Sequence, residues 1–221
     1  MSSFKEMLGL EFIKFSEENN LKKVQGCIDV FDVDVNAAGE DGLTAAHKAA
    51  TRGHDGVIQL LAATGRVDWN KVDTLGFSPL FKALFYGQLD VATIIFQQGN
   101  INFSLRTSFG NTVANLAVIG QNVACVEILA KQENCNCWNI PNKSGNTPIM
   151  NAIRVDNPDI VKILLDCPRV DPNKKDGNGD SPVMKAIKEE IDAMARMLIK
   201  CPRVDLGVKD RNGSSLLKIA M

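Results

Sequence analysis

The sequence predicts an all-α repeat protein, an α-solenoid built from helix-turn-helix units. One observation is a nearly verbatim repeat, in which the stretch that begins at Cys167-Pro-Arg-Val-Asp171 recurs 34 residues later as Cys201-Pro-Arg-Val-Asp205. A second is a series of glycines spaced by 34 or 35 residues: Gly42, Gly76, Gly110, Gly145, Gly179 and Gly213. A fixed period of this size indicates that one structural unit has been copied.

Each of these glycines predicts a turn that leads into a helix. Two residues after each glycine stands a Ser or Thr, a residue type that caps helix N-termini, and in three units a Pro follows at the first helical position. The glycine itself can take the positive φ that a tight turn needs. Eighteen residues after each of the first five glycines, an apolar pair such as Leu60-Leu61 or Ile163-Leu164 marks a second helix.

The period divides the chain into repeats of one domain that spans residues 1–221. Residues 4–40 form an N-terminal capping repeat, in which two amphipathic helices flank Glu17–Asn20 and the outer face is more charged. Full repeats follow at 41–72, 73–106, 107–141, 142–175 and 176–209, and a partial repeat covers 210–221. Because the last helix has barely begun at Met221, we expect a fragment of a longer protein; a shortened capping helix is the alternative.

The repeat at 107–141 departs most from the others. It lacks Pro after Thr112 and has Gly120 near the end of its first helix. Its turn glycine, Gly110, lies 35 residues before the next one instead of 34. A glycine within a helix costs about 0.5–1 kcal/mol relative to alanine. We therefore expect this repeat to be the least stable one, and the alternative is that function has shaped it.

Composition excludes several classes of protein. The chain has 221 residues and a formal net charge of −1, so nothing global favours nucleic acid or an anionic membrane as a partner. No apolar run approaches the roughly 20 residues of a membrane helix, and the N-terminus lacks a signal-peptide pattern. We expect a cytoplasmic or nuclear protein, a monomeric domain, and no membrane insertion.

No catalytic or metal-binding constellation can be assembled from the sequence. The chain has two histidines, His47 and His54, and both are assigned structural roles. Without a base that could activate a nucleophile, we expect no enzyme and no cofactor. Asp176 begins a stretch that mimics a calcium loop, but the bidentate Glu is missing. Cys135-Asn-Cys137 is interpreted as a pair of spare thiols, with a metal or redox site as the alternative.

Three segments resemble the Thr-Pro-Leu-His signature of ankyrin repeats: Thr44-Ala-Ala-His47, Ser78-Pro-Leu-Phe81 and Thr147-Pro-Ile-Met150. The resemblance covers roughly residues 5–221 and implies a stack of helix pairs with β-hairpin loops. It departs from the pattern at the signature His, which is replaced in the other units by Phe81, Asn115, Met150, Met184 and Lys218. The hydrogen bond that this His makes between loop and helix is therefore left open in those repeats.

The resemblance also implies where a partner would bind. Ankyrin-like stacks bind through the loop tips and the exposed positions of the first helices, which line a concave groove. Carried over position by position, an apolar centre would comprise Phe85, Tyr86, Leu116 and Ile119. The predicted basic flanks are Lys48, Arg52 and Lys82 on one side, and Arg154, Lys185 and Lys188 on the other.

We therefore expect a non-catalytic protein–protein interaction module that binds an acidic segment with an aromatic or aliphatic anchor. The module would be part of a larger multidomain protein. The alternative is a stand-alone inhibitory or regulatory subunit that masks a site on its partner. A merely solvated face, with Phe85 and Tyr86 packed on the next repeat, would leave the binding surface elsewhere. Buried residues are predicted at Trp69, Trp138, Met150 and Met184.

Overall fold

The computed structural model describes residues 2–31 and 33–216, and its helices alternate with loops throughout that part of the chain. The chain divides into two compact units, one ending at Ser108 and the other beginning at Phe109. No helix in the described ranges combines the length and the apolar character that crossing a bilayer requires. Lys218 and the part of the predicted last helix from residue 217 onward lie outside the described residues.

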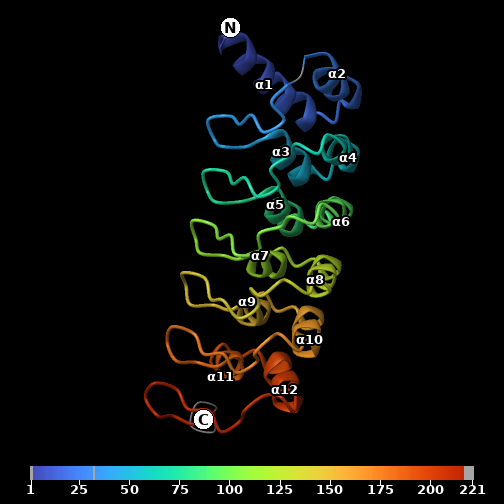
Figure 1. Cartoon of the computed structure of the whole chain (residues 1–221). Helices are drawn as coiled ribbons and strands as arrows, with labels where there is room; N and C mark the ends of the chain where they lie inside the picture. The colour runs from blue at the N-terminus through green and yellow to red at the C-terminus, as the bar shows by residue number, and fades with distance from the viewer. Residues whose placement is uncertain (1, 32, 217–221) are drawn as a thin grey trace. The chain divides into compact units, whose positions relative to one another are not determined.

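The first unit contains three helix pairs (Figure 1). They are α1 (Ser2–Glu17) with α2 (Leu21–Phe31), α3 (Ala45–Arg52) with α4 (Asp55–Ala63), and α5 (Pro79–Phe85) with α6 (Leu89–Phe96). The inner helices α1, α3 and α5 pack in sequence, and so do the outer helices α2, α4 and α6. The capping pair keeps the period of 34, because Phe12 and Val24 are buried like their equivalents Ala46 and Ile58.

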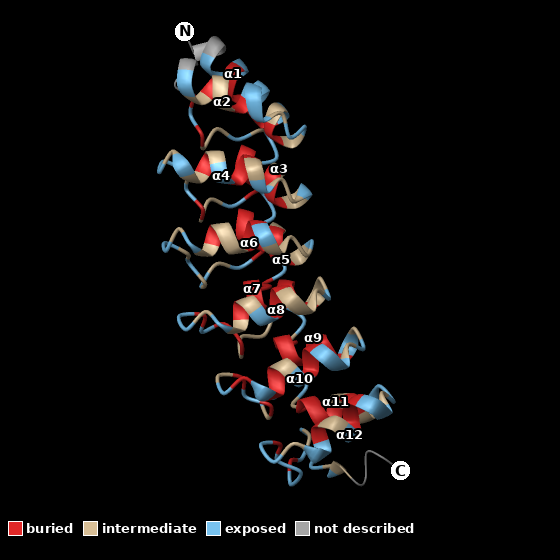
Figure 2. Ribbon diagram, turned by 90° about the vertical axis from the view of Figure 1, so that its right-hand side faces the viewer, coloured by how far each residue is buried: buried red, intermediate tan, exposed pale blue. Residues whose placement is uncertain are grey.

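The second unit repeats this arrangement with α7 (Val113–Ile119), α8 (Val123–Ala130), α9 (Pro148–Arg154), α10 (Pro158–Asp166), α11 (Pro182–Lys188) and α12 (Asp192–Lys200). The inner helices α7, α9 and α11 pack in sequence, as do the outer helices α8, α10 and α12. In both units the buried residues gather in the helices, whereas the loops are largely exposed (Figure 2). Gly120 follows the last residue of α7 instead of lying inside the helix, so the expected helical penalty does not arise.

A hairpin-shaped loop connects each outer helix to the next inner helix. In the loop before α5, Asp73 N–H donates to Phe77 O and Gly76 N–H donates to Asp73 O, both at 2.9 Å. Gly76 has φ +81°, and an added Cβ would lie 2.9 Å from Arg106 O, so only glycine fits there. The predicted hairpins are therefore present as turns, with isolated bridges such as Ala38 to Thr44.

Helix capping explains the substitutions of the signature His. Thr44 and His47 form a capping box, and His47 Nε2 lies 2.9 Å from Phe77 O in the following loop. Asn115 reproduces both contacts in the third repeat. Its Oδ1 accepts from Thr112 Oγ1 at 2.8 Å, and its Nδ2 donates to Asn146 O at 3.3 Å. An amide thus replaces the imidazole without loss of either bond.

Methionine at the same position cannot make these bonds. Met150 and Met184 are fully buried, as predicted for core residues, and a thioether is only a weak acceptor for a neighbouring hydroxyl. The cap residues of these helices, Thr147 and Ser181, accordingly have buried hydroxyl groups without a hydrogen-bond partner in the described structure. Both repeats with an orphaned cap hydroxyl thus carry Met at the signature position, whereas Ser78, which precedes Phe81, still accepts from Phe81 N–H at 3.3 Å.

Asparagine side chains tie successive loops together. In the first unit, Asn36 Nδ2 donates to Arg66 O and Asn36 Oδ1 accepts from Asp68 N–H, both at 2.8 Å. The same two bonds, at 2.7–2.8 Å, link each of three further asparagines to the next loop: Asn70, Asn139 and Asn173. Each side chain satisfies one donor and one acceptor of backbone that would otherwise have no regular partner.

The Cys-Pro-Arg motif has a structural role at the ends of the outer helices. The Arg203 guanidinium donates to Leu165 O at 2.8 Å and to Cys167 O at 3.0 Å at the end of α10. Arg169 likewise donates to Ala130 O and Gln132 O at the end of α8. Helix C-termini leave carbonyls without partners and carry a partial negative charge, so a cation is well placed there.

Candidate protein-binding surface

Each inner helix from α3 to α11 has several predicted surface positions, and the first of them along the chain is less exposed than expected. In the five repeats this position is occupied by Lys48, Lys82, Leu116, Asn151 and Lys185. Leu116 is 2% exposed and Asn151 is fully buried, while the lysines at this position are half-buried. In two repeats the residue at this position contacts the hairpin loop of its own repeat, since Lys82 and Lys185 each reach an aspartate at the start of that loop.

The prediction that Leu116 belongs to an exposed apolar centre is therefore wrong. Every residue of α7 from Val113 to Val118 is buried, so the Leu116 side chain belongs to the core of the second unit. Ile119, the last residue of the same helix, is half-buried. Truncating Leu116 would test stability and not binding.

An aromatic cluster occupies the inner face of the first unit. It consists of Phe77, Phe85 and Tyr86, and their rings meet edge to face. The centroids of Phe85 and Tyr86 lie 5.0 Å apart, and those of Phe77 and Phe85 lie 6.4 Å apart. Tyr86 is 52% exposed, whereas Phe85 is half-buried. The Phe85 ring thus packs against the Tyr86 ring on the protein side, and the tyrosine ring faces the solvent.

The predicted cations of the first unit already have acidic partners. Lys82 Nζ lies 2.8 Å from Asp73 Oδ2 and 4.5 Å from the centroid of the Phe77 ring. Glu17 lies between Lys48, at 3.5 Å, and Arg52, at 2.6 Å. The expected basic flank is therefore corrected, because carboxylates offset the charge of all three side chains.

The same contacts alter the acidity of the two carboxyl groups. The hydrogen bond from Arg52 is the main reason that the pKa of Glu17 lies below its ordinary value. Burial of Asp73 opposes its ionisation. The hydrogen bonds from Lys82 and from Phe77 N–H outweigh that effect, so the pKa of Asp73 is also lowered. Both groups are thus ionised at neutral pH and remain paired with the cations.

In the second unit two of the three predicted cations are paired. Lys185 lies 3.4 Å from Asp176 Oδ2 and 3.7 Å from Glu189 Oε1. Lys188 lies 2.6 Å from Asp180 Oδ1, and this hydrogen bond raises the pKa of Lys188. Arg154 is exposed, and no ion pair to it is seen within residues 2–31 and 33–216. Arg154 is thus the cation of this set that is best placed to attract an acid.

The acidic partners are residues that the sequence reasoning missed. Asp73 and Asp176 precede Lys82 and Lys185 by nine residues, and this recurrence at equivalent positions of two repeats is a signal that could have found them. Glu17 carried no such signal, because it belongs to the capping repeat, whose loop and helix lengths differ. Phe77 is missed because it stands in the loop and not on a helix.

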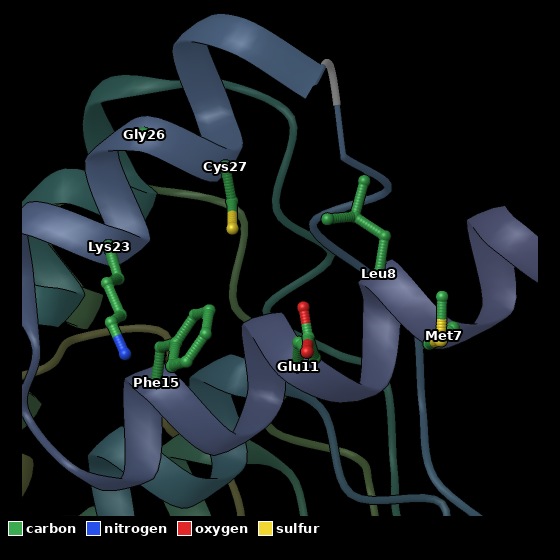
Figure 3. Close-up of a pocket in the computed structure, with 7 residues that line it drawn as sticks. All are labelled: Met7, Leu8, Glu11, Phe15, Lys23, Gly26 and Cys27. Atoms are coloured by element: carbon green, nitrogen blue, oxygen red, sulfur yellow. The ribbon is translucent and has the colours of Figure 1, made fainter.

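A separate cavity of about 460 Å³ lies between α1 and α2 (Figure 3). Its lining residues are Met7, Leu8, Glu11, Phe15, Lys23, Gly26 and Cys27. Glu11 and Lys23 carry the charges of this lining, the rest of which is apolar, and Met7 is 55% exposed. Burial, and secondarily the charge of Glu11, raises the pKa of the Cys27 thiol.

The buried titratable groups serve the fold. Burial lowers the pKa of His47 to about 4, and its Nδ1 accepts from Thr44 N–H at 3.2 Å. Cys135 Sγ and Cys137 Sγ lie 3.1 Å apart, and this contact raises the pKa of Cys135 and lowers that of Cys137. In the part of the chain that the structure describes, no three His, Cys, Asp or Glu side chains gather in a way that could hold a metal ion.

These features define an α-helical repeat protein of the kind that binds other proteins. They are the helix pairs, the hairpin loops between them, and the inner face with its exposed aromatic residue. The model of the family described as "Ankyrin repeats (3 copies)" matches residues 13–107 and 99–176. The chain therefore belongs to the ankyrin-repeat family. Ankyrin repeats are protein–protein interaction modules.

A solved structure shares the fold across nearly the whole chain. It is the ankyrin repeat domain of Bcl-3, described as a unique member of the IkappaB protein family, and it superposes with a TM-score of 0.87. The match covers 95% of this chain and 93% of that one at 18% sequence identity. No curated protein sequence matches the chain. The likeness thus supports the fold and leaves the partner to be inferred from the surface.

Proposed function

We propose that the chain is a non-catalytic interaction module that binds an apolar and acidic segment of a partner protein on its inner-helix face. The exposed ring of Tyr86, supported by Phe85, carries this proposal. Tyrosine is enriched among the residues that dominate binding energy in protein interfaces, because it buries a large rigid surface and keeps a polar tip. The partner segment accordingly offers an aromatic or aliphatic side chain to the aromatic cluster.

The charges around the cluster support selectivity more than affinity. A carboxylate of the partner would meet Lys48, Arg52 and Lys82 only by sharing them with Glu17 and Asp73. The pairs of Glu17 are partly exposed, and such pairs contribute little net energy and mainly tune the rate and the specificity of association. The Lys82–Asp73 pair is largely buried and is less accessible to a partner. Binding should therefore depend only weakly on salt. In the second unit, Arg154 is the group that would attract an acidic residue of the partner.

The proposal is tested by comparing four proteins in a pull-down from lysate that is read by mass spectrometry: the wild type, Tyr86→Ala, Tyr86→Phe and Ile199→Ala. Ile199 is 45% exposed on α12 and serves as the matched control, because it removes exposed apolar surface away from the inner helices. A partner that binds at Tyr86 should be retained by wild type, Tyr86→Phe and Ile199→Ala. It should be lost with Tyr86→Ala, for which a loss of at least about 2 kcal/mol is expected at a hot spot.

The same experiment separates the broader interpretations. A partner whose own activity falls when the wild type binds would support the stand-alone inhibitory subunit over a module of a multidomain protein. Proteins that are retained equally by Tyr86→Ala and by wild type would show that the aromatic cluster is not the binding surface. Circular dichroism of each variant provides the control for folding.

A further inference from the structure

The end cavity, defined by the seven residues that line the space between α1 and α2, presents a face that other repeats bury. With the period of 34, Glu11, Lys23 and Cys27 correspond to Ala45, Val57 and Leu61 of the next repeat. The latter three residues are fully buried and apolar. The capping pair thus carries a carboxylate and an ammonium group where the inner repeats carry Ala and Val.

The lining of the cavity suits an apolar occupant. Met7, Leu8 and Phe15 come from α1, and Cys27 comes from α2, whose backbone is bare at Gly26 (Figure 3). A volume of about 460 Å³ lies within the range of cavities that hold ligands, and Met7 in its lining is more than half exposed. Contiguous exposed apolar surface with a polar rim marks an interaction site.

The rim carries opposite charges on its two walls. Glu11 stands on α1, and Lys23 stands on α2 with its Nζ 4.5 Å from the centroid of the Phe15 ring. A two-fold symmetric contact requires a patch that is complementary to itself. When two copies of this face meet about a two-fold axis through the cavity, Glu11 of each copy can approach Lys23 of the other, and the apolar linings cover each other.

We propose that the end cavity is an interface at which a second copy of this chain docks through the same face. The monomer expected from the sequence is thereby revised to a self-associating protein. This interface is independent of the aromatic cluster, since Tyr86 directly follows α5 and contributes nothing to the cavity. Loss of self-association and loss of partner binding are therefore separable in one set of variants.

The charges provide the first test, by sedimentation equilibrium over a concentration series up to hundreds of micromolar. The mass of the wild type should rise from 24.1 kDa toward twice that value. Glu11→Lys alone and Lys23→Glu alone each place like charges together at both contacts, and each should weaken the dimer about tenfold. An equimolar mixture of the two variants restores both attractions in a heterodimer and should recover the wild-type mass.

Filling the cavity provides the second test. A Cβ added at Gly26 meets no atom within 4 Å, and Gly26 lines the cavity, so a phenylalanine at this position has open space in which to begin. Gly26→Phe should abolish the dimer, while Gly26→Ala, the matched control, should retain it. Tyr86→Ala should leave the mass unchanged. Thermal unfolding of every variant confirms that the fold is kept, and alanine at a helical glycine raises helix propensity.

Two results would overturn the proposal. The first is a wild type whose mass stays at 24.1 kDa over the whole concentration series. This result would overturn the proposal even if a different protein bound in the cavity of the wild type and not in that of Gly26→Phe. The second is a dimer whose dissociation constant does not change in Glu11→Lys, Lys23→Glu or Gly26→Phe. Recovery of the dimer only in the mixture of the two charge variants supports it.

Discussion

His47 accepts from its cap residue only while its ring is neutral. A carbonyl can only accept, so the 2.9 Å contact with Phe77 O places the ring hydrogen on Nε2 and leaves Nδ1 as the acceptor. Nδ1 is met by Thr44 N–H at 3.2 Å and by the Thr44 hydroxyl at 2.8 Å. A proton on Nδ1 would remove the bond from Thr44 N–H, would force the Thr44 hydroxyl to turn and accept, and would leave a charge in a buried site. The lowered pKa expresses this cost.

The first unit should therefore lose stability in mild acid. The folded pKa of His47 is about 4, and an unfolded histidine titrates near pH 6.5. Between these values the unfolded chain binds more protons, so stability falls as the pH falls. Between pH 7 and pH 5 the expected loss is about 2 kcal/mol, measured by urea unfolding. The lowered pKa values of Glu17 and Asp73 affect stability mainly at still lower pH.

The chain supplies its own control for this prediction. His47→Asn copies the arrangement of Asn115, which makes both bonds with a group that does not titrate in this range. The variant should be close to wild type in stability at pH 7 and should lose much less stability at pH 5. An equally large loss of stability in the variant would assign the acid sensitivity to another group.

At the scale of helices, the N-cap residues of the second unit differ in whether their hydroxyl groups form hydrogen bonds. Thr112 Oγ1 accepts from Asn115 N–H at 3.3 Å and donates to Asn115 Oδ1 at 2.8 Å, while the Thr147 hydroxyl is buried without a partner in the described structure. Removing a paired cap typically costs about 1 kcal/mol, and removing an unpaired buried hydroxyl costs little or stabilises.

Valine tests this difference, because it replaces the hydroxyl of threonine by a methyl group of similar size. Thr112→Val should lower the free energy of unfolding by about 1–2 kcal/mol, whereas Thr147→Val should leave it unchanged or raise it slightly. Urea unfolding at pH 7 measures both. Equal losses in the two variants would contradict the assignment of an unpaired hydroxyl to Thr147.

The order of the helices could be predicted from the sequence, but the state of the surface could not. Glycine spacing and cap residues located the helix pairs, and the buried positions of Trp69, Trp138, Met150 and Met184 followed from their period. Side-chain pairing does not follow from a repeat pattern, because Glu17 and Asp73 approach their partners only after the loops have folded. The pattern also did not reveal that Leu116 is buried.

At the scale of the whole molecule, each compact unit contains one tryptophan. Trp69 belongs to the first unit and Trp138 to the second, and both are buried. Both histidines also belong to the first unit. In repeat proteins each repeat interacts with its neighbours, so a local loss of stability need not spread evenly through the chain.

Acid should therefore act unevenly on the two fluorescence signals. With Trp138→Phe the emission reports the first unit, and with Trp69→Phe it reports the second. Lowering the pH from 7 to 5 should shift the urea midpoint of the Trp69 signal more than that of the Trp138 signal. Equal shifts in the two proteins would show that the chain unfolds as one cooperative unit.

The hydrogen bonds between successive repeats also bear on how a gene of this kind can gain repeats. The side chains that form them are Arg169, Arg203, Asn139 and Asn173. Two successive junctions are closed by the same side chains at the same places. A tandem duplication of the codons for residues 168–201 would therefore encode an extra unit that already carries the groups needed to join its neighbours on both sides. Lengthening by recombination would require no further compensating mutation at these joints.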